Sequence, residues 1–232
     1  MHRYFLPKPV HFCFTCDGAV FLHMRRDEYV GLNRHEAQTL RRLIANGSAN
    51  DLELASLAEV LVANGLLTTS MGKQTRPIEP TFIEAPRGLL LDVDALSEVP
   101  AISLRHVLRF FLSCVSVWAV LRVGGLACAI RRLQMRKTRG AGKSRQADAT
   151  NSQLLIRIFV HLRLFAYTAR EHCLFDSLVL CDFLQRCGVV PTCVFGVRTL
   201  PFGAHCWVLV NGRLATESNA QQLSIFSPIL VL

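Results

Sequence analysis

Short runs of apolar residues near the start of the chain predict a small β-sheet. Residues 10–15 and 19–24 are β-prone, and the turn-forming sequence Cys16-Asp17-Gly18 separates them. After a polar turn, residues 29–32 can form a third strand. We therefore expect a three-stranded antiparallel sheet at the N-terminal end.

After these strands, apolar residues recur at the spacing of an α-helix. Asn33 precedes a periodic apolar segment and Glu36 stands three residues later, which is the pattern of a capping box. This predicts one helix from residue 33 to 46, and a second pattern predicts another over residues 51–63. Residues 1–71 therefore read as one unit.

The middle of the chain contains segments of several different compositions. Residues 72–88 carry three prolines and are interpreted as a linker. Residues 89–130 are mainly helical in pattern, and 152–170 read as an amphipathic helix. Between them, residues 131–146 hold seven basic residues and no acidic one, which favours a mobile basic loop.

One apolar run tests whether the chain crosses a membrane. Residues 110–121 are uncharged, Arg122 interrupts them, and residues 123–130 continue the run. A spanning helix needs about 18 predominantly apolar residues, and an arginine near its centre is costly. We therefore expect a buried or surface-docked helix.

The last sixty residues predict a helix followed by a hairpin. Residues 173–187 have helical spacing, and residues 192–197 and 204–210 are β-prone. Asn211-Gly212 is a strong hairpin signal, so we expect residues 213–217 to return beside the preceding strand.

Composition narrows the class of protein. Hydrophobic residues make up 51% and charged residues 19%, which excludes a disordered chain. The net charge of +9 permits an acidic partner. The first ten residues do not read as a secretory signal, so we expect a cytoplasmic protein whose nine cysteines are reduced and mostly part of the core. Cys13 and Cys16 form a single CxxC without a second pair, which argues against a metal site.

Cys173 and His205 are the residues with candidate chemistry. A cysteine at the start of a helix has a stabilised thiolate, because the helix dipole and unpaired N–H groups favour negative charge. His205 begins a strand 32 residues later and can serve as general base and then general acid. The returning hairpin would bring Thr216 or Glu217 beside it to orient the imidazole.

The segment around this pair resembles a known family. Residues 172–212 look like the transglutaminase-like peptidase domain of lasso peptide maturation B proteins, and residues 10–70 are similar to the PqqD-like leader-recognition element that some of these proteins carry. The matching positions are Cys173, Ser177, Gly188, Gly196-Val197-Arg198, Pro201-Phe202, Ala204-His205, Trp207 and Asn211-Gly212, with Leu32-Asn33 near the N-terminus.

The resemblance implies an α+β architecture. Residues 1–71 would be a small winged-helix-like leader-recognition domain of three strands and helices. Residues 72–88 would be the linker. Residues 89–232 would be a transglutaminase-like, or papain-like, α+β domain with a helical insertion.

The resemblance also implies a function. Such proteins bind the leader of a ribosomally made precursor and cleave it off, and a cyclase resembling asparagine synthetase then closes the macrolactam. Cys173 would be the nucleophile and His205 the base. The leader would lie along the third strand and last helix, at Glu28, Tyr29, Val30, Leu32, Leu57 and Leu61. For Leu57, Val60 and Leu61, ordinary core packing is at least as good an interpretation.

One position departs from the family. Glu217 stands where the family has an aspartate, twelve residues after the histidine. A glutamate can orient an imidazole, although it is one methylene longer, and Asn211 or Asn219 are amide alternatives.

Two other functions compete with the peptidase. The chain could be a non-catalytic scaffold that delivers the leader-bound precursor to the cyclase. A basic winged-helix nucleic-acid binder is the other alternative, but no helix rich in Arg, Asn and Gln supports it, so no nucleic-acid partner is expected. We expect no bound cofactor and no metal. The sequence lacks a P-loop, so any ATP dependence would come through the cyclase. A peripheral membrane contact would come through an export transporter.

Overall fold

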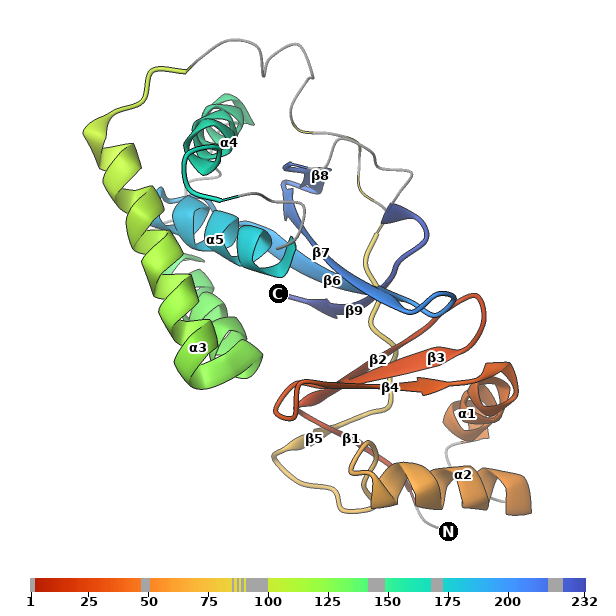
Figure 1. Cartoon of the computed structure of the whole chain (residues 1–232). Coiled ribbons are helices and arrows are strands. Elements are labelled where there is room, and N and C mark those ends of the chain that lie inside the picture. Colours follow the sequence, from red (N-terminus) through yellow and green to blue (C-terminus); the bar gives the residue numbers. More distant parts are fainter. Residues whose placement is uncertain are drawn as a thin grey trace. The chain divides into compact units, whose positions relative to one another are not determined.

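The computed structural model divides into two compact units (Figure 1). It describes residues 3–46, 51–84, 86, 88, 90, 100–141, 149–167, 173–216 and 223–232. The first unit contains Met1–Ile83, Gly196–Ala204 and Phe226–Leu230, and the second contains Glu84–Phe195, His205–Ile225 and Val231–Leu232. The chain first passes between units within the segment interpreted as a linker.

The first unit contains the three-stranded sheet that the sequence predicts. Its strands are β2 (Val10–Phe14), β3 (Ala19–His23) and β4 (Glu28–Leu32), in the order β2-β3-β4. Both pairings are antiparallel, with Phe12 opposite Phe21 and Phe21 opposite Val30. The three predicted strands are confirmed to within about one residue at each end.

Two capped helices follow the sheet, as predicted. Helix α1 (Arg34–Asn46) begins at the expected capping box: the Asn33 N–H donates to Glu36 Oε2 at 2.9 Å, and the Glu36 N–H donates to Asn33 Oδ1 at 3.0 Å. Helix α2 (Leu52–Ala63) begins after Asp51, whose carboxylate accepts from the Glu53 N–H. These local hydrogen bonds satisfy N–H groups that a helix start leaves without partners.

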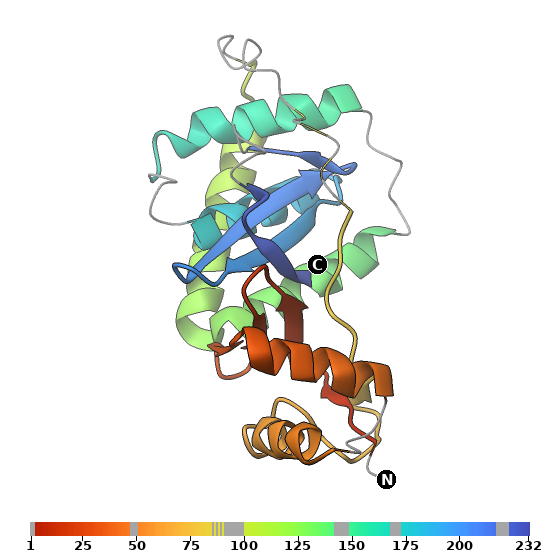
Figure 2. The same cartoon turned by 90° about the vertical axis from the view of Figure 1, so that its right-hand side faces the viewer.

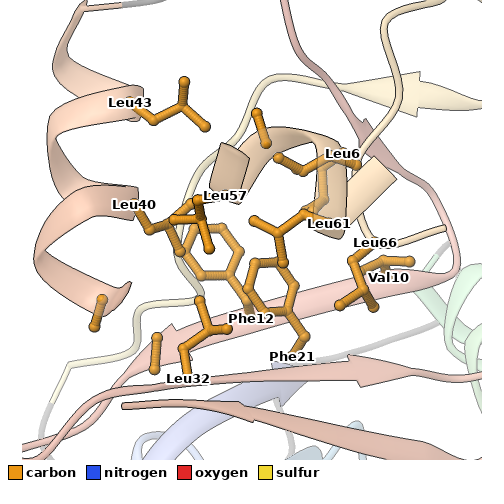
Figure 3. Close-up of a cluster of buried hydrophobic side chains, with 14 of the residues drawn as sticks. Leu6, Val10, Phe12, Phe21, Leu32, Leu40, Leu43, Leu57, Leu61 and Leu66 are labelled. Atoms are coloured by element: carbon orange, nitrogen blue, oxygen red, sulfur yellow. The ribbon is translucent and has the colours of Figure 1, made fainter. Parts of the chain in front are cut away.

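The core of the first unit lies between this sheet and the two helices (Figure 3). Phe12 and Phe21 stack with ring centroids 5.1 Å apart and point from the sheet toward the helices. Around them pack Leu6, Val10, Leu32, Leu40, Leu43, Leu57, Leu61 and Leu66.

The segment interpreted as a linker is partly built into the first unit, which corrects that prediction. Strand β1 (Leu6–Pro7) pairs with β5 (Thr75–Arg76), and the Thr81 N–H donates to the Phe12 carbonyl at 2.8 Å. The prolines break regular structure, but the Thr81 N–H that follows Pro80 still finds a partner in the first sheet.

The C-terminal part of the chain contains a four-stranded sheet with the order β8-β7-β6-β9. Its strands are β6 (Thr192–Arg198), β7 (Gly203–Val210), β8 (Arg213–Leu214) and β9 (Ser227–Val231). Asn211 and Gly212 turn between β7 and β8 with φ of 53° and 76°, the left-handed pair of a tight hairpin. The hairpin is confirmed, although β8 is shorter than predicted, and β9 was not predicted.

Three helices cover one face of this sheet. Helix α5 (Cys173–Arg186) lies between the sheet and α3 (Leu104–Ala141), and α4 (Ala149–Arg163) packs against both helices (Figures 1 and 2). Nine consecutive residues of α5, from Asp176 to Leu184, are buried.

Two predictions for these helices need correction. The basic segment expected to be a loop from residue 131 is helical as far as Ala141. One of its arginines, Arg136, pairs with buried Asp182 of α5, which anchors the helix. The helix expected over 152–170 ends at Arg163, and residues 168–170 lie outside the described residues.

Helix α3 contains the apolar run. It is the only helix among the described residues that is long and apolar enough to span a membrane, and 22% of the relevant window is buried. Gly125 breaks the helix in two with φ of 64° and ψ of −169°. Phe110 and Val117, in the first half, are buried against the rest of the unit, as expected for a docked helix.

Candidate active site

Cys173 is the first residue of α5 and is half-buried. Its sulfur therefore lies where the helix dipole and unpaired N–H groups favour an anion. The N–H groups of Leu174, on the same helix, and Cys206, on β7, both donate to this sulfur. The predicted placement of Cys173 is confirmed.

His205 lies near the start of β7 and hydrogen-bonds with the Cys173 side chain. This hydrogen bond is the largest influence on Cys173 and lowers the pKa of its thiol. Burial of the sulfur opposes the shift, whereas the charge of His205 and the two backbone N–H groups add to it. The structure thus brings together the cysteine and histidine that the sequence singled out.

A buried hydrogen bond holds α5 against the histidine strand. The Ser177 hydroxyl, one helical turn after Cys173, donates to the Cys206 carbonyl at 2.9 Å. Because Cys206 follows His205 directly, this bond fixes the helix that bears the nucleophile relative to the strand that bears the base. The sequence marks Ser177 only as part of the family pattern and gives no signal for this role.

The other side of the first α5 turn is held by an ion pair that the sequence analysis missed. The Asp176 carboxylate accepts from Arg163 at 2.8 Å and from the Tyr167 hydroxyl at 2.9 Å. Burial, reinforced by the Asp176 charge, raises the pKa of Tyr167, so this hydroxyl stays protonated and donates. Together the two donors attach the end of α4 to the start of α5.

The third member of the predicted triad, Glu217, lies outside the described residues, as does Asn219. Asn211 is wrong as an alternative, because it lies in the turn beyond β7, six residues after His205. At about 3.3 Å per strand residue this is roughly 20 Å away. After the turn, the Ala215 N–H donates to the Val208 carbonyl, so the chain runs back along β7 toward His205.

This arrangement can carry out nucleophilic acyl chemistry. A thiolate at Cys173 can attack a carbonyl carbon, and His205 can protonate the leaving amine and then activate water. The ring of Trp207 stacks near His205, with centroids 6.1 Å apart and planes 24° apart. Trp207 is buried, so it limits the motion of the imidazole.

The predicted leader-binding residues separate into two groups. Leu32, Leu57 and Leu61 are buried in the core of the first unit, so the core interpretation applies to them and they offer no surface to a leader. Glu28 is exposed, whereas Tyr29 and Val30 are half-buried. These three remain candidates on β4.

The other cysteines are free thiols in varied surroundings. Burial raises the pKa of Cys13 to about 12, whereas Cys16 is exposed and donates to Asp17, which raises its pKa. Cys193 and Cys206 are buried with their sulfurs 3.4 Å apart. In the described part of the chain, no cluster of three or more His, Cys, Asp or Glu side chains is placed to hold a metal ion.

The lowered pKa of Cys173 predicts selective alkylation by iodoacetamide. Only the thiolate reacts, so Cys173 should stay reactive at a lower pH than Cys16, whose pKa is raised. In His205→Ala the pKa of Cys173 should rise, and the midpoint of its pH–rate profile should move upward. Mass spectrometry of the two peptides from the same digest measures both rates. Equal profiles in wild type and His205→Ala would contradict the Cys173–His205 interaction.

Comparison with known proteins gives one family match. A family model described as the transglutaminase-like superfamily matches residues 111–231, which include Cys173 and His205. No curated protein and no solved structure matched the chain.

Proposed function

Because the chain belongs to the transglutaminase-like superfamily, whose members are typically cysteine hydrolases, we propose that it is a cysteine peptidase acting on the precursor of a lasso peptide. It binds the leader of this ribosomally made precursor and cleaves it from the core peptide. The observation that carries the proposal is the hydrogen bond between Cys173 and His205, which lowers the pKa of the thiol. The resemblance of residues 172–212 to lasso maturation B proteins supplies the substrate class.

The sheet of the first unit supports peptide binding. The outer edge of β2 is occupied, because Thr81 donates to the Phe12 carbonyl and Arg76 donates to the Val10 carbonyl at 2.8 Å. Strand β4 forms the opposite edge in the order β2-β3-β4. An extended leader can add to such an edge as a further strand, with main-chain hydrogen bonds supplying affinity.

Apolar anchors for the leader come from the surface of α2 rather than from its buried face. Leu52 and Val60 are exposed on this helix, unlike Leu57 and Leu61. We propose that the leader pairs with Glu28–Leu32 and that its apolar side chains contact exposed positions of this kind. Exposed apolar side chains gain the most from burial under a ligand.

The proposed reaction places the protein before a cyclase. Attack by Cys173 breaks the amide bond after the leader, and hydrolysis of the thioester releases the leader carboxylate. The core peptide leaves with a free α-amine, which an asparagine synthetase-like cyclase can join to a side-chain carboxylate. No cofactor is needed for these steps, and any ATP requirement belongs to the cyclase. The proposed location is the cytoplasm, with membrane contact through an export transporter.

The test begins with the genes next to this one. We expect a short reading frame for a precursor, together with a cyclase and a transporter. Incubating the protein with the synthetic precursor should release two fragments whose masses sum to the precursor plus one water. A neighbourhood without a precursor, or an uncleaved precursor, would remove the assignment of the substrate.

Strand addition has its own test. Leaders with single N-methylated amides lose one N–H donor each, so affinity for Cys173→Ala should fall at alternate positions of the bound segment. Fluorescence anisotropy of labelled leaders measures this pattern. Uniform affinities would show that the leader does not bind as a strand.

A non-catalytic scaffold is the alternative function. It predicts the same leader binding but no cleavage by the wild-type protein. It gives no role to the lowered pKa of Cys173.

A further inference from the structure

The first half of α3 presents a row of apolar side chains to solvent. They recur at spacings of three and four residues, so they share one face of the helix. We call this row the α3 stripe: Leu104, Leu108, Phe111, Leu112, Val115 and Trp118, each 46–84% exposed. From Leu104 to Trp118 there are fourteen steps of 1.5 Å along the helix, so the stripe is about 21 Å long. Figure 1 shows this half of α3 in yellow-green, on the side of α5 away from the sheet.

The opposite face of the same helix is packed. Phe110, Ser113 and Val117 are buried, and the Phe110 ring meets those of Phe159 and Phe183 edge to face. The stripe therefore cannot turn inward without breaking this core. A contiguous exposed apolar surface of this kind marks an interaction site.

The charge around the stripe has one sign. The first half of α3, from Leu104 to Gly124, carries three arginines and no acidic residue. Arg105 and Arg122 are exposed at the two ends of the stripe, and the Arg122 guanidinium lies 5.9 Å from the centre of the Trp118 ring. Apolar side chains, an exposed tryptophan and flanking arginines are the composition of helices that lie in the headgroup region of a bilayer.

We propose that the α3 stripe binds the surface of an anionic phospholipid bilayer, with the helix lying parallel to it. The apolar side chains enter the acyl boundary, and Arg105 and Arg122 contact the phosphates. A spanning orientation does not fit, because Gly125 breaks the helix and the opposite face is packed on the protein core. The single sign of charge favours lipid phosphates over a protein surface of mixed charge.

This proposal concerns lipid itself and does not depend on the peptidase function. Cys173 lies on α5 and takes no part in it, so Cys173→Ala should bind vesicles like the wild type. Loss of cleavage and loss of vesicle binding can therefore be observed separately.

Tryptophan fluorescence tests the proposal directly. Trp118 is 57% exposed and Trp207 is 4% exposed, so only Trp118 can change its surroundings at a bilayer. Adding vesicles of phosphatidylcholine with about one third phosphatidylglycerol should shift the emission to shorter wavelength. Trp118→Phe should remove this shift but still co-sediment with the vesicles. The protein should bind vesicles of pure phosphatidylcholine at least about tenfold more weakly.

A matched pair of variants locates the contact. Val115→Glu places a charge in the stripe and should weaken co-sedimentation at least about tenfold. Met71→Glu makes the same change at an exposed apolar side chain in the first unit and should bind like the wild type. Circular dichroism confirms that both variants are folded. Failure of the wild type to bind anionic vesicles would overturn the proposal. The proposal would also be overturned if Val115→Glu bound anionic vesicles as well as the wild type does. It would be overturned as well if the wild type formed a dimer that Val115→Glu dissociates and did not bind vesicles.

Discussion

Cleavage of the precursor by Cys173→Ala is expected to be at least about a thousandfold slower than by the wild type. The reason is that Cys173 supplies the sulfur that forms the thioester and is the thiol that hydrogen-bonds with His205. Leader affinity should be unchanged, because β4 and α2 are intact. Single-turnover mass spectrometry with enzyme in excess measures the rate, and anisotropy measures the affinity.

The matched control for this variant is Cys128→Ala. Cys128 is an exposed cysteine on α3, and the same loss of a thiol there should leave the cleavage rate within about twofold of the wild type. Cleavage that persists in Cys173→Ala would disprove the nucleophile. Equal loss in both variants would point to a general effect of removing thiols.

The largest loss of stability is expected from Asp182→Ala. The Asp182 carboxylate is 1% exposed and receives hydrogen bonds from Arg136 on α3 and, at 2.6 Å, from Arg186 on α5. Removing it leaves two largely buried guanidinium groups without their counter-ion. Such a change lowers the free energy of unfolding by about 3–5 kcal/mol. Urea denaturation followed by circular dichroism measures this difference.

Asp17→Ala is the control for this prediction. Asp17 also pairs with an arginine, Arg34, but both groups are solvated at the surface, so only a small change is expected. If Asp182→Ala and Asp17→Ala unfold at the same urea concentration, the Asp182 ion pairs do not hold α3 against α5.

The elements predicted from sequence were those whose signals are local. The capping box at Asn33 and Glu36 and the hairpin at Asn211-Gly212 depend on residues within four positions of one another, and both are confirmed. Strand β9 was missed because Pro228 lies inside it. Proline is acceptable there because β9 is the edge of its sheet, which only the strand order reveals.

The basic segment shows why charge alone misled the prediction. Its arginines and lysines read as a solvated loop, but Arg136 has its partner, Asp182, on a helix that starts more than thirty residues later. Ion pairs between distant residues leave no periodic signal in a single sequence.

In the candidate site, too, only the features with a local sequence signal could be predicted. Cys173 and His205 are identified by residue type, helix start and strand start. The N–H donors of Leu174 and Cys206 belong to the backbone, so no residue type marks them. In the sequence, Asp176 differs from its neighbours only as a charged residue on an apolar helix. Its partner Arg163 lies on a different helix, α4, so the sequence does not indicate the ion pair.

The burial of α5 has a consequence for how the site moves. Amide hydrogens exchange with solvent when a segment opens, and a helix covered on all sides opens only with the unit as a whole. The amides from Asp176 to Leu184 should therefore be among the last in the chain to take up deuterium. Cys173 stands one turn before them, at the half-buried start of the helix. Cys173 is thus joined directly to the segment that should open last, which limits the local motion of its sulfur.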